Sequence, residues 1–232
     1  MARIVVFLTS MLIASTGFAQ EPAKTAGSSD GIAKTFIHDE FKIWTSPAHI
    51  QKSDLPWISV FAVNTAVLLR EDPNISREIA ESDRLNPPSH FISSLGGIPV
   101  FAAPAGILAL GKLTHHEDLA LTGSLSLRAV LHASLVAQAG KAIAGRERPI
   151  EGNGLGRFLV GGNSFPSGHS MASWAFATVV ARRTNNKWIK LGSYSLATAV
   201  GMSRIGGRNH FPSDVLVGST GGYLIGRYMT KN

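Results

Sequence analysis

The sequence predicts an all-α protein that folds as a compact bundle of helices. Apolar residues recur at helical spacing along most of the chain, and no segment alternates apolar and polar residues long enough to form a strand. Clusters of Pro, Gly, Asn and Asp separate the apolar stretches and mark helix ends. The 232 residues are enough for one domain with a substantial core and few for two.

The first twenty residues are typical of an export signal rather than of a folded element. Arg3 supplies the positive charge, residues 4–13 are apolar, and Gly17-Phe18-Ala19 fits a cleavage site. The apolar stretch is short for a membrane span. We therefore expect an exported protein, either periplasmic or at the outer face of the cytoplasmic membrane. The expected divisions are 1–20 as signal peptide, 21–33 as mobile leader and 34–232 as the folded domain.

The first helix of the domain is expected to begin at Ser53-Asp54, a good N-cap, and to run to about Arg70. Asp72-Pro73-Asn74 is expected to end it, because proline disfavours a helical residue before it and lacks an N–H donor. A short polar helix is then expected at 76–82. The remaining expected segments are an apolar stretch at 90–113, a Gly-rich loop at 150–165, and helices at 116–143, 168–183, 187–204 and 212–230.

Two observations bear on a membrane. Residues 91–111 carry no charge, which meets the length criterion for a span, although Pro104 weakens a straight helix there. The helix after His169 is apolar only to Ala181, before Arg182-Arg183, and rises roughly 17–18 Å against a hydrocarbon core of about 30 Å. We expect a largely soluble or peripherally bound domain, with an integral membrane enzyme as the alternative.

The composition points to anionic partners. The net charge is +7 and there is no cysteine, so disulfides and thiolate chemistry are excluded. A positive balance favours phosphorylated substrates or acidic lipid headgroups, and a membrane surface is a second expected partner. No basic stretch is interleaved with aromatic residues in the manner of a nucleic-acid-binding segment, so no nucleic-acid partner is expected.

His210 and Asp214 form the first candidate catalytic pair. Pro212 fits the first turn of a helix, so a carboxylate four residues after His210 can reach back to the imidazole. If Asp214 accepts the proton of Nδ1, Nε2 keeps its lone pair and can act as a nucleophile. A surface hydrogen bond at a helix start would give the same spacing.

His169 follows Pro166-Ser167-Gly168 at the expected start of a helix. Glycine allows a ligand to approach the backbone, and helix N-termini bind anions through exposed N–H groups. A histidine there can protonate a leaving oxygen and later activate a water. An ordinary turn with an incidental histidine is the alternative.

Lys141, Arg148 and Arg204 are candidate oxyanion ligands. Arginine binds phosphoryl oxygens two at a time and lysine adds a point charge, and such donors stabilise the charge that develops during phosphoryl transfer. Three other arginines are interpreted as solvated residues at helix ends, where a positive charge complements the helix dipole. The residues interpreted in this way are Arg146, Arg182 and Arg183.

Three motifs occur in order within 74 residues: Lys141-x6-Arg148-Pro149, Pro166-Ser167-Gly168-His169 and Ser203-Arg204-x5-His210-x3-Asp214. They resemble the type 2 phosphatidic acid phosphatase superfamily, which also contains class A acid phosphatases and vanadium haloperoxidases. The resemblance implies a metal-independent phosphatase of the helical-bundle type acting on phosphate monoesters, with lipid phosphates slightly favoured over soluble ones.

The resemblance also implies a role for each motif residue. His210 would form a phosphohistidine, His169 would be the acid and base, and Asp214 would orient His210. The implied phosphate-binding residues are Lys141, Arg148, Ser167, Gly168 and Arg204. No cofactor or metal is implied, and vanadate would bind as an inhibitor. Two alternatives stay open: a vanadate-dependent haloperoxidase with His210 as the vanadium ligand, and a non-catalytic anion- or lipid-binding module on the same scaffold.

Overall fold

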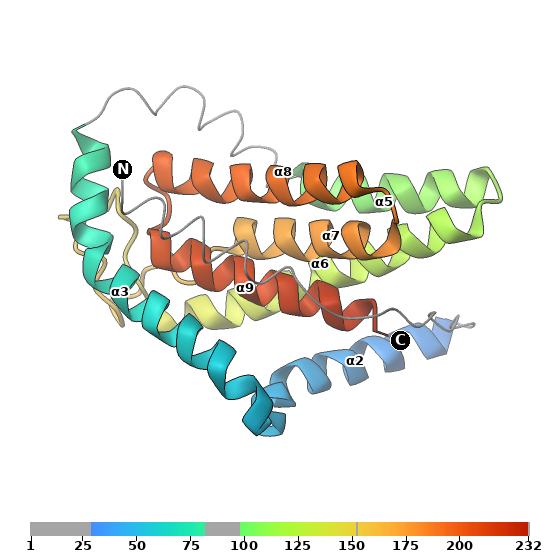
Figure 1. Cartoon of the computed structure of the whole chain (residues 1–232), viewed down its shortest axis with the longest axis horizontal. Helices are drawn as coiled ribbons and strands as arrows, with labels where there is room; N and C mark the ends of the chain where they lie inside the picture. Colours follow the sequence, from blue (N-terminus) through green and yellow to red (C-terminus); the bar gives the residue numbers. More distant parts are fainter. Residues whose placement is uncertain (1–28, 82–97, 152, 232) are drawn as a thin grey trace. The chain divides into compact units, whose positions relative to one another are not determined.

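A computed structural model describes residues 29–81, 98–151 and 153–231, and every regular element in these ranges is a helix (Figure 1). The all-α prediction is confirmed. The elements are α2 (Ser29–Thr45), the 3-10 helices η1 (Ser46–His49) and η2 (Lys52–Asp54), α3 (Leu55–Ala80), α5 (Ile98–Leu113), α6 (Glu117–Ala144), α7 (Gly168–Arg183), α8 (Lys187–Gly206) and α9 (Pro212–Met229). The expected export signal lies outside the described residues.

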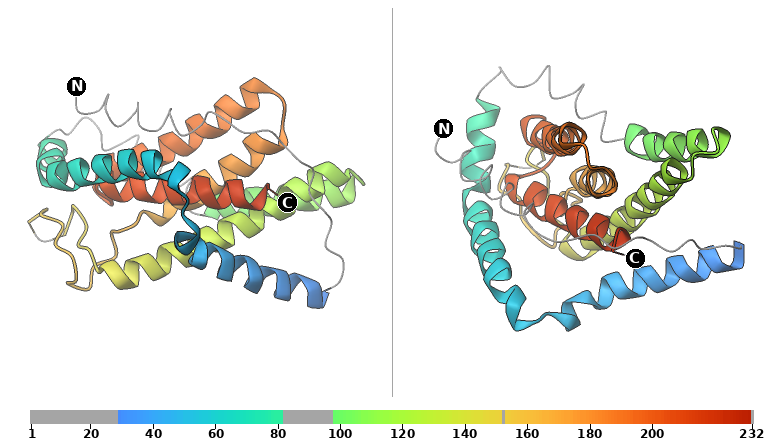
Figure 2. Two further views of the ribbon diagram at one scale, coloured as in Figure 1. Left: turned by 60° about the horizontal axis from the view of Figure 1, so that its bottom comes forward. Right: turned by 45° about the vertical axis from the view of Figure 1, so that its right-hand side comes forward.

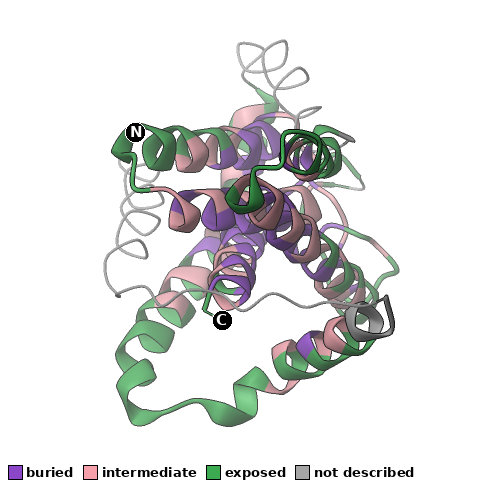
Figure 3. Cartoon of the chain, turned by 90° about the vertical axis from the view of Figure 1, so that its right-hand side faces the viewer, coloured by how far each residue is buried: buried purple, intermediate pink, exposed green. Residues whose placement is uncertain are grey.

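The chain divides into two units, residues 1–68 with 231–232 and residues 69–230. The described part of the first unit contains α2, η1, η2 and the first half of α3. Helix α2 begins at Ser29, so the last residues of the expected leader are helical. Most side chains of this unit are exposed, as the green colouring of its helices in Figure 3 shows, and they include large apolar ones such as Trp57 and Val63.

Helix α3 begins at Leu55, directly after the expected cap, but it does not end where the sequence predicts. It continues through Pro73 to Ala80. The prediction of a stop and of a separate helix at 76–82 is therefore wrong. A proline inside a helix costs about 3 kcal/mol, and tertiary contacts outweigh this cost here. Asp72 and Ser76, on either side of the proline, are both buried, and Asp72 is bonded to residues more than seventy positions further along the chain.

Helix α7 is the centre of the second unit and contacts α5, α6, α8 and α9 (Figure 2). The predicted helices 116–143, 168–183, 187–204 and 212–230 correspond to α6–α9 within two residues. Side chains 170–175 of α7 are all buried. Because one helix is surrounded on several sides, its mostly small residues set how closely the neighbours pack.

Helices α7 and α9 approach each other closely at glycines. A Cβ atom added to Gly218 would collide with the carbonyl oxygen of Ser167, and one added to Gly222 would collide with that of Met171. Only glycine leaves room for this backbone contact. The close approach places the N-terminus of α7 against the first turns of α9, and the amide of Ser167 donates to the carbonyl of Asp214 at 3.0 Å.

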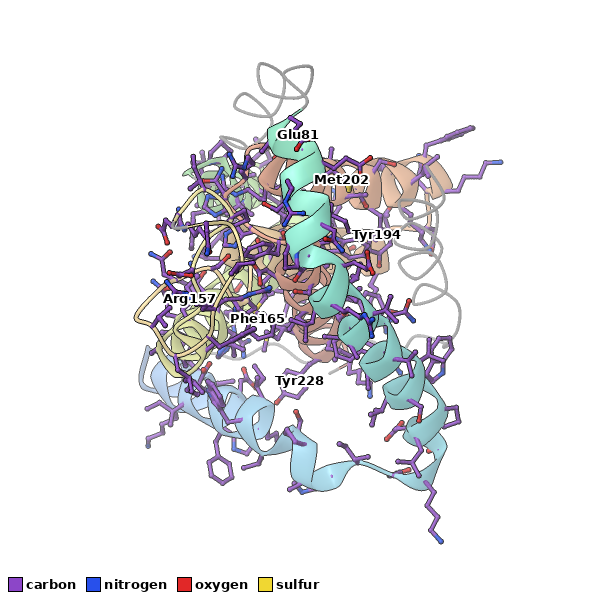
Figure 4. All side chains as sticks on the ribbon, turned by 90° about the vertical axis from the view of Figure 1, so that its left-hand side faces the viewer. Glu81, Arg157, Phe165, Tyr194, Met202 and Tyr228 are labelled. Atoms are coloured by element: carbon purple, nitrogen blue, oxygen red, sulfur yellow. The ribbon has the colours of Figure 1, made fainter. Side chains whose placement is uncertain are left out.

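The Gly-rich loop between α6 and α7 is held to the end of α6. Gly145 ends α6 in the left-handed conformation, with φ of 50°, and the amide of Leu159 returns to the carbonyl of Ala144 at 2.9 Å. The amide of Ser164 donates to the carbonyl of Arg146 at 2.8 Å. On the outer side Arg157 pairs with Glu147 at 2.8 Å; Figure 4 labels Arg157. The loop is therefore a folded element and not a loose connector.

Apolar side chains also cover much of the outside of the second unit. Within the described part of the chain, α6 is the helix with the length and composition to cross a membrane, a test that a core helix of a soluble protein also passes, and 39% of its most apolar window is buried in the fold. Large exposed apolar residues of α5, α6 and α8 are Phe101, Leu110, Leu113, Leu131, Leu135, Ile143, Trp188, Ile189, Leu191 and Leu196.

The arginines at the end of α7 are not simply solvated. Arg182 donates to the hydroxyl of Thr230 at 2.7 Å, and Arg183 pairs with Asp118 at 3.2 Å. Both are half-buried. Arg183 is thus ion-paired and Arg182 is hydrogen-bonded to residues outside α7, so the interpretation of both as solvated cations needs a correction.

Candidate active site

The three sequence motifs meet at one end of the second unit. The amide of Ser167 donates to the backbone carbonyl of Asp214, and the amide of His210 donates to the carbonyl of Arg204 at 3.2 Å. A Cβ atom added to Gly168 would lie 3.8 Å from Nζ of Lys141. The end of α6, the start of α7 and the connection from α8 to α9 therefore supply one cluster.

His210 is buried, with 1% of its surface exposed. Its Nδ1 lies 2.6 Å from the carbonyl oxygen of Ser164 and 3.7 Å from Oδ2 of Asp214. A carbonyl oxygen only accepts, so Nδ1 carries the proton and Nε2 keeps its lone pair. Burial lowers the pKa of His210, Asp214 raises it, and Arg204 and Lys141 lower it, with a net decrease. The imidazole is therefore neutral at pH 7.

The expectation that Asp214 accepts the Nδ1 proton needs a correction. The acceptor at hydrogen-bond distance is the Ser164 carbonyl, because the loop folds back and places this group beside the ring. Asp214 lies close enough to stabilise a positive imidazolium by charge, and it reaches His210 indirectly, since its Oδ2 accepts the hydroxyl of Ser164 at 2.5 Å. The Ser164 carbonyl thus sets the tautomer and orientation of the His210 ring. The Asp214 carboxylate stabilises a positive charge on that ring.

Asp214 is fully buried, and its carboxylate accepts two further hydrogen bonds. Its Oδ2 accepts the amide of Phe211 at 2.8 Å, which closes the first turn of α9, and its Oδ1 accepts Nη1 of Arg146 at 2.6 Å. Burial raises the pKa of Asp214, but His210, Arg146 and Ser164 lower it more, so the net shift is downward. Asp214 is a carboxylate at neutral pH.

Arg146 is the main residue that sequence reasoning misplaced. The sequence predicts a solvated cation at a helix end, but the Arg146 side chain is buried, with 1% of the residue exposed. Its guanidinium carbon lies 4.7 Å from the ring centre of Phe158 and 4.2 Å from that of Phe211. In addition to Asp214, it donates to Asp72 at 2.8 Å. No feature of the local sequence separates Arg146 from a solvated arginine, because its partners lie 68 and 74 positions away.

Asp72 and Ser213 complete this buried network. Oδ2 of Asp72 accepts the hydroxyl of Ser213 at 2.5 Å, and the same hydroxyl accepts Nη1 of Arg146 at 2.8 Å. Burial raises the pKa of Asp72 to about 6, against the lowering by Arg146 and Ser213. Asp72 is therefore mostly ionised at pH 7, and two carboxylates share one guanidinium beneath His210.

His169 lies in the first turn of α7 and is half-buried. Burial lowers its pKa to about 4, with further lowering by Arg204, His210, Lys141 and Arg148. These interactions place both predicted histidines among the three predicted cations. A bound dianion would offset the cations and raise the pKa of His169, so that it could hold a proton when a phosphoryl group is present.

Lys141, Arg148 and Arg204 lie close enough to perturb one another. Burial lowers the pKa of Lys141, and Arg148 and Arg204 lower it further, while Asp214 raises it. Burial and then Arg148 lower the pKa of Arg204 to about 10. Nε of Arg148 donates to Oδ1 of Asn163 at 2.7 Å, which fixes this side chain on the loop. Mutual repulsion of cations held in this way favours binding of an oxyanion.

Ser167 and Gly168 differ in what they offer a ligand. The Ser167 hydroxyl is fully buried, lies 2.9 Å from Oγ of Ser170 and caps α7. Its amide is also used, so the geometry gives no support to the predicted contact of Ser167 with phosphate. Gly168 is half-exposed beside Lys141, as expected for a residue over which a ligand can lie. Among the described residues, no group of three or more His, Asp or Glu side chains could hold a metal ion.

Comparisons with known proteins find sequence similarity over part of the chain. A model of the PAP2 superfamily matches residues 123–232. A lipid A 1-phosphatase of Porphyromonas gingivalis is 37% identical over 90 residues, which are 38% of this chain and only 18% of that protein.

Two solved structures share the fold. The crystal structure of Aquifex aeolicus LpxE aligns with a TM-score of 0.54 and 22% identity, covering 69% of this chain and 95% of that one. The first transmembrane PAP2 type phosphatidylglycerolphosphate phosphatase from Bacillus subtilis aligns with a TM-score of 0.59 and 22% identity, covering 77% and 94%.

Proposed function

We propose a function from the premise that residues 123–232 belong to the PAP2 superfamily: the protein hydrolyses phosphate monoesters, with lipid phosphates as its substrate class. One observation carries this proposal. Nδ1 of His210 is held by the Ser164 carbonyl, which leaves Nε2 unprotonated in a cluster with Lys141 and Arg204. A neutral, oriented imidazole among cations suits nucleophilic attack on a phosphoryl group.

In the first step Nε2 of His210 attacks phosphorus, and the bond from phosphorus to the ester oxygen breaks. Protonated His169 gives its proton to the departing alcohol. The product is a phosphohistidine, whose imidazolium charge is stabilised by Asp214 at 3.7 Å. The negative charge on the three non-bridging oxygens is met by Lys141, Arg148 and Arg204.

In the second step neutral His169 takes a proton from a water molecule, and the water oxygen attacks phosphorus. The bond from phosphorus to Nε2 breaks, which returns His210 to its neutral state and releases inorganic phosphate. We propose that this cycle needs no metal, because three fixed cations supply the charge compensation that Mg²⁺ gives in other phosphoryl-transfer sites. Vanadate, which mimics the transition state, would inhibit.

The lipid class rests on two lines of support. The relative from Porphyromonas gingivalis is by name a lipid A phosphatase, and the neighbour from Bacillus subtilis a transmembrane phosphatidylglycerolphosphate phosphatase. In this chain, large apolar side chains are exposed along α5, α6 and α8, and exposed apolar surface of this extent marks contact with a partner or a membrane. We propose that the enzyme is exported and associated with a membrane.

Trapping the covalent intermediate tests the proposal. The protein is mixed with a ³²P-labelled aryl phosphate, quenched in alkali and separated on a gel. We expect a label that survives alkali and is lost in acid, as a phosphohistidine requires, and no label in His210→Ala. An acid-stable label, or a label retained by His210→Ala, would contradict the mechanism.

His169→Ala provides the matched control. An aryl leaving group departs without a proton, so the first step should proceed, whereas the second step lacks its base. We therefore expect label to accumulate in His169→Ala above the wild-type level while turnover falls by roughly 10²–10⁴-fold. Equal loss of label in both histidine variants would show that the two roles are assigned wrongly.

A further inference from the structure

A second cavity lies outside the His210 cluster. It measures about 100 Å³ and is lined by α3, by the loop after Pro149 and by the connection from α8 to α9, through residues that include Ser76, Arg77, Asn153 and Arg208. None of the predicted catalytic or phosphate-binding residues lines it. The volume is well above the ~10–15 Å³ that one water requires, so a small oxyanion fits.

Two polar groups at this cavity have no hydrogen-bond partner. Ser76 is 4% exposed, and its Oγ is unpartnered; Nε of Arg208 is buried and also unpartnered. Buried polar groups are nearly always bonded, because leaving one unsatisfied costs about 1–3 kcal/mol. Ser76 and Arg208 both line the cavity, so the unsatisfied donors of these two side chains are the groups that a hydrogen-bond acceptor bound there would engage.

The arrangement of Arg208 supports a built site. Its Nη2 donates to the carbonyl of Pro149 at 3.0 Å, which fixes the guanidinium on the wall of the cavity. Its backbone has φ of 53°, a left-handed conformation that is uncommon for arginine and that concentrates at functional sites. The fold thus holds this side chain in place at some cost in backbone energy.

Charge defines the class of ligand. Two arginines and one amide line the cavity, and none of its lining residues is acidic. Arginine side chains bind tetrahedral oxyanions in a bidentate manner. Glu78 follows Arg77 on α3 but does not line the cavity, and Asp72 is already bonded to Arg146 and Ser213. The cavity is therefore suited to a phosphate group.

Two loops connect this cavity to the catalytic cluster. Pro149 follows Arg148 directly, and Arg208 precedes His210 by two residues. We propose that the cavity is a second phosphate-binding subsite, which accepts a second phosphate group of the substrate while the first is hydrolysed at His210. The link to hydrolysis rests on the proposed function, whereas the binding of phosphate by the cavity does not.

Direct binding tests the site. Isothermal titration of the full chain with inorganic phosphate should give two phosphates per chain. Arg208→Asn removes the guanidinium but suits the left-handed backbone, and this variant should bind one phosphate per chain. Arg77→Gln should weaken phosphate binding at the same cavity. Arg70 is an exposed arginine of α3, the helix that carries Arg77. Arg70→Gln is therefore the control and should still bind two phosphates per chain. One phosphate per chain in both wild type and Arg208→Asn would overturn the proposal.

Arg148→Gln separates this proposal from the proposed function. It should remove the phosphate of the catalytic cluster and keep that of the second cavity. If Arg148→Gln changes nothing while Arg208→Asn still loses one phosphate, the second site stands and the catalytic assignment fails. Loss of both phosphates in Arg208→Asn, with unchanged helix content, would show that the two sites are not distinct and would overturn the proposal.

Kinetics identify the source of the phosphate. With a lipid that carries two phosphate groups and its monophosphate counterpart, we expect wild-type kcat/KM to favour the bisphosphate by about 10-fold, the value for one charged hydrogen-bonded contact. Arg208→Asn should bring this ratio to near one without changing kcat/KM for the monophosphate. A ratio of one in wild type, with two phosphates bound, would identify free phosphate as the occupant and refute the substrate subsite.

Discussion

Replacement of Arg146 by glutamine probes the buried network under His210. Arg146 is 1% exposed and donates to both Asp214 and Asp72, at 2.6 and 2.8 Å. Glutamine keeps part of the volume and can donate one hydrogen bond, but it carries no charge. Two buried carboxylates would then share a site without a cation. The variant therefore loses charge compensation rather than packing alone.

The size of the effect follows from the burial of the pair. Removing one partner of a buried ion pair costs about 3–5 kcal/mol, because the remaining charge is left uncompensated. For a chain of this length this corresponds to a fall in Tm of roughly 6–20 °C. Adding Asp72→Asn removes one of the two orphaned carboxylates and should recover about 0.5–3 kcal/mol. Asp72→Asn alone should also destabilise, since Arg146 and Ser213 lose a charged acceptor.

Thermal and urea unfolding followed by circular dichroism at 222 nm measure these differences. Arg157→Gln is the matched control, because Arg157 lies on the same loop and pairs with Glu147, but its side chain is 61% exposed. It should unfold almost as wild type does, since solvent screens exposed pairs. If Arg146→Gln is as stable as Arg157→Gln, or if Asp72→Asn adds to its loss instead of offsetting it, the reasoning about shared charge is refuted.

Three further predictions concern catalysis and packing. A general acid acts while protonated, and the pKa of His169 is lowered to about 4. With a lipid phosphate, whose alcohol leaves only with a proton, kcat/KM should therefore fall as pH rises from about 4 to 8. The fall of kcat should begin at higher pH, because the bound dianion offsets Arg204, and a rise of kcat/KM over this range would contradict the assignment. Chelation with EDTA should leave the rate on an aryl phosphate unchanged, and a loss restored by Mg²⁺ would disprove metal independence. Gly222→Ala, which forces a Cβ against the carbonyl of Met171, should lower unfolding free energy by about 1–3 kcal/mol, whereas Gly192→Ala in open space on α8 should raise it slightly; equal effects would refute the close-packing argument.

The sequence predicts the helices from α6 onward to within two residues. It also identifies most of the residues that gather around His210. Helix ends are set by local signals: Gly145 ends α6, Asn186 caps α8 through its side chain, and Pro212 opens α9. Such signals act within one turn of the chain and can be read without the fold. The motif residues could be identified because few side chains bind an oxyanion or transfer a proton, and because their order resembles that of a known family. The cluster of His169, His210 and the three cations follows from them.

Local signals failed where contacts between distant segments decided the outcome. Pro73 reads as a helix stop, yet burial of Asp72 and Ser76 carries α3 through it. Arg146 has the local sequence of a solvated cation, and its burial depends on Asp72 and Asp214 being brought to it by other helices.

The sequence by itself determined the helical class, the order of the helices and the identity of the groups that can do chemistry, because each of these depends on neighbours along the chain. Only the tertiary structure decided which charges are buried and which atom holds Nδ1 of His210. A buried charge is stable only with a partner at hydrogen-bond distance, and no spacing along the chain specifies that distance.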